Sequence, residues 1–300
     1  MHVQDAWSSY NLPVGQRSVA LPGELGFSWS CAGPPERGRH VDEGRSASQS
    51  GCETAAMSVV LAARTGSGVV VGTDSRALVY SSLVQPWAFD SECKLVVVKV
   101  RPLLVAATGT TRVGAWSFVA ATRSLEERVP PGARFEAAVD VLARHLAQAF
   151  EGASPPTGST LHLLAAGYED GSPRTCTVVL GAGEEASVRL HDAAFGLAWT
   201  GETTALDRVV NGIDGRLAEE IGASRDPRVA DALRSAAVAF PLDAMPLEDA
   251  ISLVVSLVDL AKTYHRMLPG VSTVGGATVV GVLEPDGTAS VRRIGAATTS

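Results

Sequence analysis

Two short apolar runs joined by a glycine turn constrain the fold of this chain more than any other part of its sequence. The runs cover 58–64 and 68–74, are dominated by valine and alanine, and flank the turn Thr65-Gly66-Ser67-Gly68. This pattern is typical of a β-hairpin, in which residues equidistant from the turn lie opposite one another. The hairpin therefore brings its first and last residues together at the end away from the turn.

The open end of this hairpin carries polar residues. Counting from the turn places Asp74 and Arg76 beside Ser58, which we expect to begin an edge strand. The hydroxyl would then lie next to an acid and a base. If the chain began at Ser58, its α-amine would join them, which is the arrangement that an N-terminal nucleophile requires. The alternative is an ordinary sheet in which Asp74 and Arg76 form a surface ion pair of little consequence.

Composition excludes several classes of protein. The formal net charge of −7 and pI near 5.4, without a basic stripe, argue against a nucleic-acid partner. The sequence contains neither a run of 18 apolar residues nor a secretory signal pattern, so we expect no membrane partner. Four cysteines lack the spacing of a metal knuckle or a disulfide framework, and we interpret them as free thiols of a cytoplasmic protein: Cys31, Cys52, Cys93 and Cys176. No cofactor and no metal are implied.

The chain divides into three parts. Residues 1–56 are rich in Ser, Gly, Pro and Arg without periodicity, and we predict a disordered N-terminal extension or propeptide. Met57 stands directly before the first strand and is a plausible alternative start. A single domain is predicted over 57–294, followed by a C-terminal tail at 295–300.

Blocks of strands alternate with blocks of helices within the domain. Helices are predicted at 111–128, 133–150, 203–221 and 247–267, and further strands at 94–100, 102–107, 160–167, 174–181, 186–191, 277–283 and 288–294. Segregated antiparallel strands and helices predict an α+β fold. Two sheets with helices on both outer faces would accommodate this order in one domain.

A series of motifs along the chain is more specific than any one of them alone. Asp74 follows Ser58 by sixteen residues (74 − 58 = 16) in Thr-Asp-Ser-Arg. The later motifs are Lys94-Leu95, Ala107-Thr108-Gly109-Thr110, Gly167-Tyr168-Glu169 and Trp199-Thr200-Gly201-Glu202-Thr203. In this order they resemble the proteasome β-type family of N-terminal nucleophile hydrolases, which includes related bacterial peptidase rings. The resemblance spans about 57–294 and implies a four-layer αββα sandwich of two stacked antiparallel sheets flanked by helices.

Two departures from the family pattern stand out. The interval from Arg76 to Lys94 is about four residues longer than usual, which predicts an expanded loop at 80–91. The family commonly has an assisting Asp-x-x-Ser-Gly segment after the last helix, but residues 268–276 contain no Asp. A hydroxyl from Ser272 or Thr273 could substitute for part of it.

The resemblance implies a role for each residue around the hydroxyl. Ser58 would be the nucleophile, and its own α-amine the base that takes the proton. The Lys94 ammonium would favour the neutral amine by like-charge repulsion, and Asp74 would hold Lys94 charged and oriented. Arg76 would brace the adjoining loop. Thr54 is the alternative nucleophile, although it lies four residues too early.

Two further positions would complete the site. The backbone N–H of Gly109 is the expected oxyanion donor, and Thr200 could hydrogen-bond the free amine. Ordinary structural explanations remain for a helix-entry glycine at 109 and for a solvated lysine at 94. The histidines show no ligand spacing, and we interpret them as helix-surface or strand residues: His145, His162, His191 and His265.

Three functions are compatible with this pattern. The first is a peptidase that assembles into a homo-oligomeric ring, with peptides or unfolded proteins as substrates and an ATPase as a possible regulator. The second is a catalytically silent structural subunit. The third is a stand-alone amidohydrolase or acyltransferase acting on a small amide.

Overall fold

In the computed structural model, the Ser58 hairpin lies inside a five-stranded antiparallel sheet. The strand order is β13-β2-β3-β14-β15, with bounds β2 (Val59–Arg64), β3 (Val69–Asp74), β13 (Gly196–Gly201), β14 (Thr278–Leu283) and β15 (Ala289–Ile294). Val60 pairs with Thr73 and Arg64 with Val69, the register that the glycine turn predicts. Because β13 covers the free side of β2, the expectation that Ser58 begins an edge strand is wrong.

A second antiparallel sheet has the order β1-β12-β11-β10-β7-β6. Its strands are β1 (Arg17–Ser18), β6 (Leu95–Val98), β7 (Leu103–Gly109), β10 (Thr160–Glu169), β11 (Ser172–Gly181) and β12 (Ser187–His191). The structure describes residues 17–18, 58–81, 84–215 and 235–295, with a few isolated positions between 216 and 234. The predicted extension at 1–56 therefore lies outside the described residues except for β1, and the tail does so beyond Gly295.

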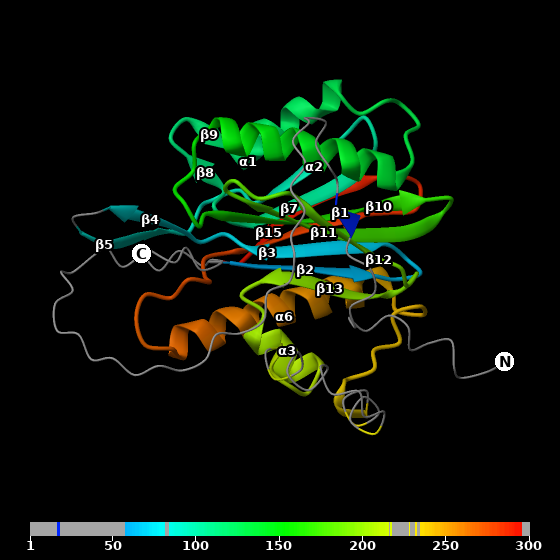
Figure 1. Ribbon diagram of the computed structural model, residues 1–300. Helices are drawn as coiled ribbons and strands as arrows, with labels where there is room; N and C mark the ends of the chain where they lie inside the picture. Colours follow the sequence, from blue (N-terminus) through cyan, green and yellow to red (C-terminus); the bar gives the residue numbers. More distant parts are fainter. Residues whose placement is uncertain are drawn as a thin grey trace.

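Helices cover the outer faces of the sheets. They are α1 (Phe118–Arg123), the 3-10 helix η2 (Ser124–Glu127), α2 (Phe135–Gly152), α3 (Thr204–Val210) and α6 (Leu247–Met267). Figure 1 shows α1 and α2 on one side of the stacked strands and α3 and α6 on the other. Buried apolar residues form three clusters: one under α2, one under α6, and one in which strands of the two sheets face each other.

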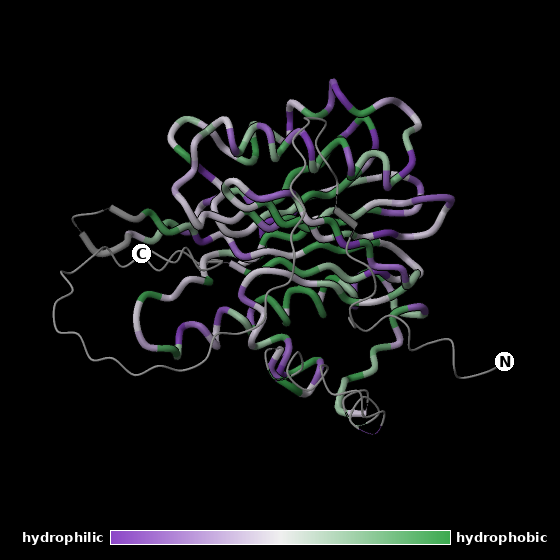
Figure 2. The backbone as a smooth tube through the Cα atoms, in the orientation of Figure 1, coloured by the Kyte–Doolittle hydropathy of each residue, from purple (hydrophilic) through white to green (hydrophobic). Residues whose placement is uncertain are grey.

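The cluster between the sheets explains the sequence of the hairpin. Every residue of β2 and β3 is buried, since one face of these strands packs on the second sheet and the other on α6. Strands buried on both faces are near-continuous apolar runs rather than alternating ones. Figure 2 shows hydrophobic residues along these central strands, with hydrophilic residues more frequent on the outer helices and loops. The predicted α+β fold with antiparallel sheets is confirmed.

Several predicted elements need correction. The helix expected at 111–128 begins only at Phe118, because β8 (Arg112–Val113) and β9 (Trp116–Ser117) pair as a tight hairpin. The Ser117 hydroxyl then accepts a hydrogen bond from the N–H of Ala120 and caps α1. Strand β13 was not predicted as a strand, because its six residues begin and end with glycine and show no clear alternation.

Two other corrections concern loops. The helix expected at 203–221 is interrupted after Val210, where Gly212 has φ of +72° and a Cβ would lie 2.6 Å from the Ala236 carbonyl oxygen. The insertion expected as a loop at 80–91 is largely a hairpin of β4 (Ala77–Ser81) and β5 (Val84–Phe89). In Figure 1 this hairpin projects from the body of the molecule.

Within the described part of the chain, no helix is long and apolar enough to cross a membrane. The same residues contain no group of three or more His, Cys, Asp or Glu side chains that could hold a metal ion. Cys93 and Cys176 are both free thiols, the former exposed and the latter buried.

Candidate active site

Ser58 precedes the first residue of β2 and is 2% exposed. Its main-chain carbonyl oxygen accepts two hydrogen bonds, from the Thr108 hydroxyl at 3.0 Å and from the Glu202 N–H at 2.8 Å. Thr108 belongs to the second sheet, and Glu202 follows β13. The residue before β2 is therefore fixed by both sheets, at the point where their strand ends meet.

Lys94 reaches Ser58 from the second sheet, one residue before β6. Its ammonium group donates hydrogen bonds to the Ser58 hydroxyl oxygen and to the main-chain carbonyl oxygen of Arg76. It also forms a salt bridge of 3.3 Å with an Asp74 carboxylate oxygen. Burial lowers the pKa of Lys94, while the neighbouring Asp74 charge opposes that shift. The alternative of a solvated strand-start lysine does not describe this side chain, which is almost completely buried.

Asp74 connects three segments of main chain beneath the lysine. One carboxylate oxygen accepts the Val59 N–H at 3.3 Å as well as Lys94, and the other accepts the N–H groups of Arg76 at 3.2 Å and Gly275 at 3.0 Å. A carboxylate with so many donors is held in one orientation. The segment at 268–276, which lacks the expected Asp, thus contributes a backbone N–H of Gly275 to the same network.

The Arg76 side chain lies at the rim of the cluster and contacts the loop, whereas the Arg76 main-chain carbonyl oxygen accepts a hydrogen bond from the Ser58 hydroxyl at 3.5 Å. Its guanidinium group forms a bidentate ion pair with Asp90, at 2.7 and 2.9 Å, and donates to the Ser272 carbonyl oxygen at 3.3 Å. The hydrogen bonds with Asp90 raise the pKa of Arg76, and those with Arg76 lower the pKa of Asp90. A Cβ on Gly275 would lie 2.4 Å from the Arg76 guanidinium carbon, so a larger residue there would displace the guanidinium group.

The remaining predicted residues lie near the cluster without contacting the hydroxyl. Gly109 ends β7 directly after Thr108, with φ of +84°, and a Cβ there would lie 2.4 Å from the Thr160 carbonyl oxygen. The Thr200 hydroxyl lies 3.3 Å from Nδ1 of His162, between the two sheets. The Ser272 hydroxyl donates to the carbonyl oxygen of Val274 and not to the cluster, which Ser272 contacts only through its main-chain carbonyl oxygen and Arg76. Thr54 lies outside the described residues.

Three residues near the cluster were not singled out from the sequence. Asp90 is the partner of Arg76, Glu202 bonds the main chain of Ser58, and His265 is 7% exposed beside Glu202. The interpretation of His265 as a helix-surface residue is wrong. A signal was present, because His265 follows Ala261 by one helical turn on the apolar face of α6.

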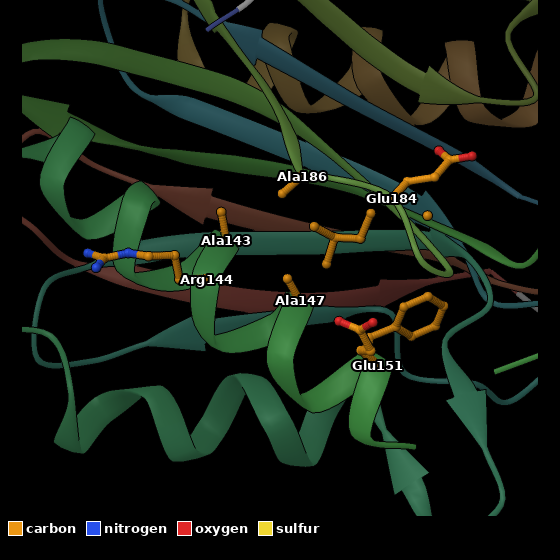
Figure 3. Close-up of a pocket in the computed structure, with 9 residues that line it drawn as sticks. Ala143, Arg144, Ala147, Glu151, Glu184 and Ala186 are labelled. Carbon is orange, nitrogen blue, oxygen red and sulfur yellow. The ribbon is translucent and has the colours of Figure 1, made fainter. Parts of the chain in front are cut away.

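The pocket drawn in Figure 3 is separate from this cluster. It lies on the outer face of the second sheet, between α2 and the turn joining β11 to β12, and shares no residue with the Ser58 network. In Figure 3 the Arg144 side chain points away from Glu151 and Glu184. Glu184 itself folds over Gly181, where a Cβ would lie 2.5 Å from a carboxylate oxygen. The buried network around Ser58 is the stronger candidate for chemistry.

Comparison with known proteins places the fold. No protein-family model matches the chain, and no curated protein matches it. Similar solved structures are a Gly-1 mutant of Anbu from Hyphomicrobium sp. strain MC1 (14% identity, 81% of this chain and 89% of that chain covered, TM-score 0.51) and a second structure of Anbu from that strain (15%, 80% and 89%, TM-score 0.48). A third is Anbu, described as ancestral beta-subunit, from Yersinia bercovieri (16% identity, 79% and 86% covered, TM-score 0.49).

The likeness to the first of these structures shows the fold alone, a mixed α+β fold that this chain shares with an Anbu protein. It also corrects the resemblance drawn from the sequence motifs. That solved structure is an Anbu protein, a group that is related to the proteasome β-type subunits but distinct from them.

Proposed function

We propose that this chain is an N-terminal nucleophile hydrolase that cleaves peptide bonds with Ser58. One observation carries the proposal: the buried Lys94 ammonium group bonds the Ser58 hydroxyl and is itself paired with Asp74. A hydroxyl buried against a lysine–carboxylate pair has the electrostatic surroundings of an activated nucleophile. We also infer that the two sheets and their helices are the four-layer αββα sandwich of this class of hydrolase.

The reaction requires that Ser58 become the first residue of the mature chain. Its α-amine then takes the hydroxyl proton as the oxygen attacks the substrate carbonyl. The amine returns this proton to the leaving nitrogen as the carbon–nitrogen bond breaks, and water releases the acyl group by the reverse sequence. Lys94 stabilises charge on the attacking oxygen, and Gly109 is our candidate for the N–H that stabilises the oxyanion.

The test uses the full chain and a peptide epoxyketone, which bonds to the α-amine and hydroxyl of the same residue. We expect N-terminal sequencing to begin at Ser58, the reagent to add there, and short fluorogenic peptides to be cleaved. Ser58→Ala should abolish labelling and cleavage. Ser67→Ala, an exposed serine on the turn of the same hairpin, should preserve both. Normal cleavage by the Ser58→Ala protein would contradict the proposal and make Thr54 the next candidate.

We further propose that copies of the chain assemble into a homo-oligomeric ring that acts on peptides or unfolded chains in the cytoplasm. The β4–β5 hairpin supports assembly, because it exposes Val79 by 54%, Trp87 by 65% and Phe89 by 48%. Neighbouring exposed apolar side chains favour contact with another protein surface. A large native mass with processed Ser58 supports this proposal. A processed monomer would favour the stand-alone amidohydrolase, and an unprocessed, unlabelled chain the structural subunit.

A further inference from the structure

A histidine–glutamate pair that the proposed reaction does not use lies beside Ser58. His265, in the last turn of α6, has its Nε2 atom 3.7 Å from a carboxylate oxygen of Glu202. Its Nδ1 atom lies 3.3 Å from the Thr273 hydroxyl. Nε2 is buried and has no hydrogen-bond partner among the described residues. An unpartnered nitrogen aimed at a carboxylate is unusual for a histidine that only fills space.

The strand register places Glu202 directly opposite Ser58. Val59 pairs with Gly201, so the next residues outward along this antiparallel pair are Ser58 and Glu202. The Glu202 N–H donates to the Ser58 carbonyl oxygen at 2.8 Å. Glu202 is therefore the residue across the strand pair from Ser58, whose nitrogen is the α-amine of a processed chain.

Several charged and polar groups surround the His265 imidazole. Burial lowers the pKa of His265, while the negative charge of Asp74 opposes that shift. Burial also raises the pKa of Glu202. The other neighbours named by the geometry are the Thr273 hydroxyl and the Tyr264 ring, at 5.5 Å between ring centroids. Burial disfavours the charged form of each group, so each keeps its charge only where an opposite charge lies close by.

We propose that Glu202 and His265 are positioning residues for the α-amine of Ser58. When the amine takes the hydroxyl proton, the Glu202 carboxylate accepts a hydrogen bond from the resulting ammonium group and stabilises its charge. His265 holds the carboxylate in place until the proton passes to the leaving nitrogen. This inference rests on the proposed function, because only a processed Ser58 has an α-amine.

The test measures the α-amine directly in the full chain as expressed and processed. Its pKa is obtained from the rate of acetylation by acetic anhydride at a series of pH values, read by mass spectrometry of the N-terminal peptide. Glu202→Gln removes the carboxylate charge and should lower the pKa of the amine by about one unit. Glu202→Asp should restore part of the shift. Glu248→Gln, an exposed acid at the opposite end of α6 from His265, should leave it unchanged.

A second readout is the pH profile of epoxyketone labelling. The rate of labelling rises with pH as the α-amine loses its proton. The midpoint of this rise should move to lower pH in Glu202→Gln and, to a smaller extent, in His265→Gln. If labelling occurs but the amine pKa is the same in wild type and Glu202→Gln, the inference is wrong while the proposed function stands. If the amine pKa shifts but no labelling or cleavage occurs, the proposed function fails and the positioning stands. A chain not processed at Ser58 overturns both.

Discussion

The main-chain carbonyl oxygen of Ser58 lies against Gly201, so closely that a Cβ on Gly201 would stand 2.1 Å from it. Gly201 also has φ of +93°, a conformation that side chains other than hydrogen disfavour. This contact allows the carbonyl to reach the N–H of Glu202 and the hydroxyl of Thr108. The glycine after Thr200 therefore controls where the proposed nucleophile sits.

The first prediction tests that contact. Gly201→Ala should displace Ser58, lower the melting temperature and reduce epoxyketone labelling by at least about tenfold, because no flexible side chain can move to make room. Gly171→Ala is the matched control, with φ of +74° but nothing within 4 Å of the added Cβ. Gly171→Ala should lower the free energy of unfolding only by the backbone strain, about 1–2 kcal/mol, and the variant should be labelled normally. Equal labelling by the two variants would show that the close contact is unimportant.

The second prediction concerns Asp74. Asp74→Asn keeps the shape but replaces one acceptor oxygen with a donor, which must then face either the Lys94 ammonium or main-chain N–H groups. We expect the rate of peptide cleavage to fall about 10²–10⁴-fold and the free energy of unfolding to fall by about 1–3 kcal/mol. Fluorogenic cleavage and urea unfolding measure the two effects. Asp259→Asn, a half-exposed acid paired with Lys262, is the control and should leave cleavage near wild type.

The third prediction separates the rim of the site from its centre. The Arg76–Asp90 pair is partly exposed, with side chains 22% and 47% accessible, so Asp90→Asn should change stability by less than about 1 kcal/mol. The main-chain carbonyl of Arg76 accepts from Lys94, however, and loosening Arg76 should disturb that acceptor. We expect labelling to slow several-fold while the melting temperature barely moves. A large loss of stability without a change in labelling would show that the Arg76–Asp90 pair stabilises the fold and does not affect the site.

The sequence predicts the part of the site on the β2–β3 hairpin better than the rest. Pairing across a hairpin follows from counting residues outward from its turn, which needs only the local sequence. Asp74 was expected beside Ser58 on that ground alone. Lys94 comes from the other sheet. Pairing within the hairpin gives no information about contacts between sheets, so only the order of the motifs indicated that Lys94 belongs to the site. Gly201 matters because its main chain packs closely against the Ser58 carbonyl oxygen, and hydrophobic periodicity does not predict such a contact. His265 continues the apolar face of α6, so its burial could have been predicted.

Competition between helical and strand hydrogen bonding over short segments explains why some elements were mispredicted. The residues at 111–117 fit a helical pattern, but a two-strand hairpin and the Ser117 cap delay the helix to Phe118. Most of the segment at 80–91, expected as a loop, belongs to the β4–β5 strand pair, which the sequence did not predict. Such short elements depend on a few hydrogen bonds, and hydrophobic periodicity does not resolve them.

The last prediction concerns acid stability and is independent of the proposed reaction. Burial lowers the pKa of His191 to about 3, with the charges of Arg64 and Arg189 acting in the same direction. An unfolded histidine has a pKa of about 6.5, so between these values the unfolded chain binds more protons than the folded one. The free energy of unfolding should therefore fall as the pH drops from about 6.5 toward 3, by at most about 1.4 kcal/mol per pH unit from this residue. His191→Gln should flatten that slope in urea unfolding at several pH values, and an unchanged slope would show that His191 is free to protonate in the folded protein.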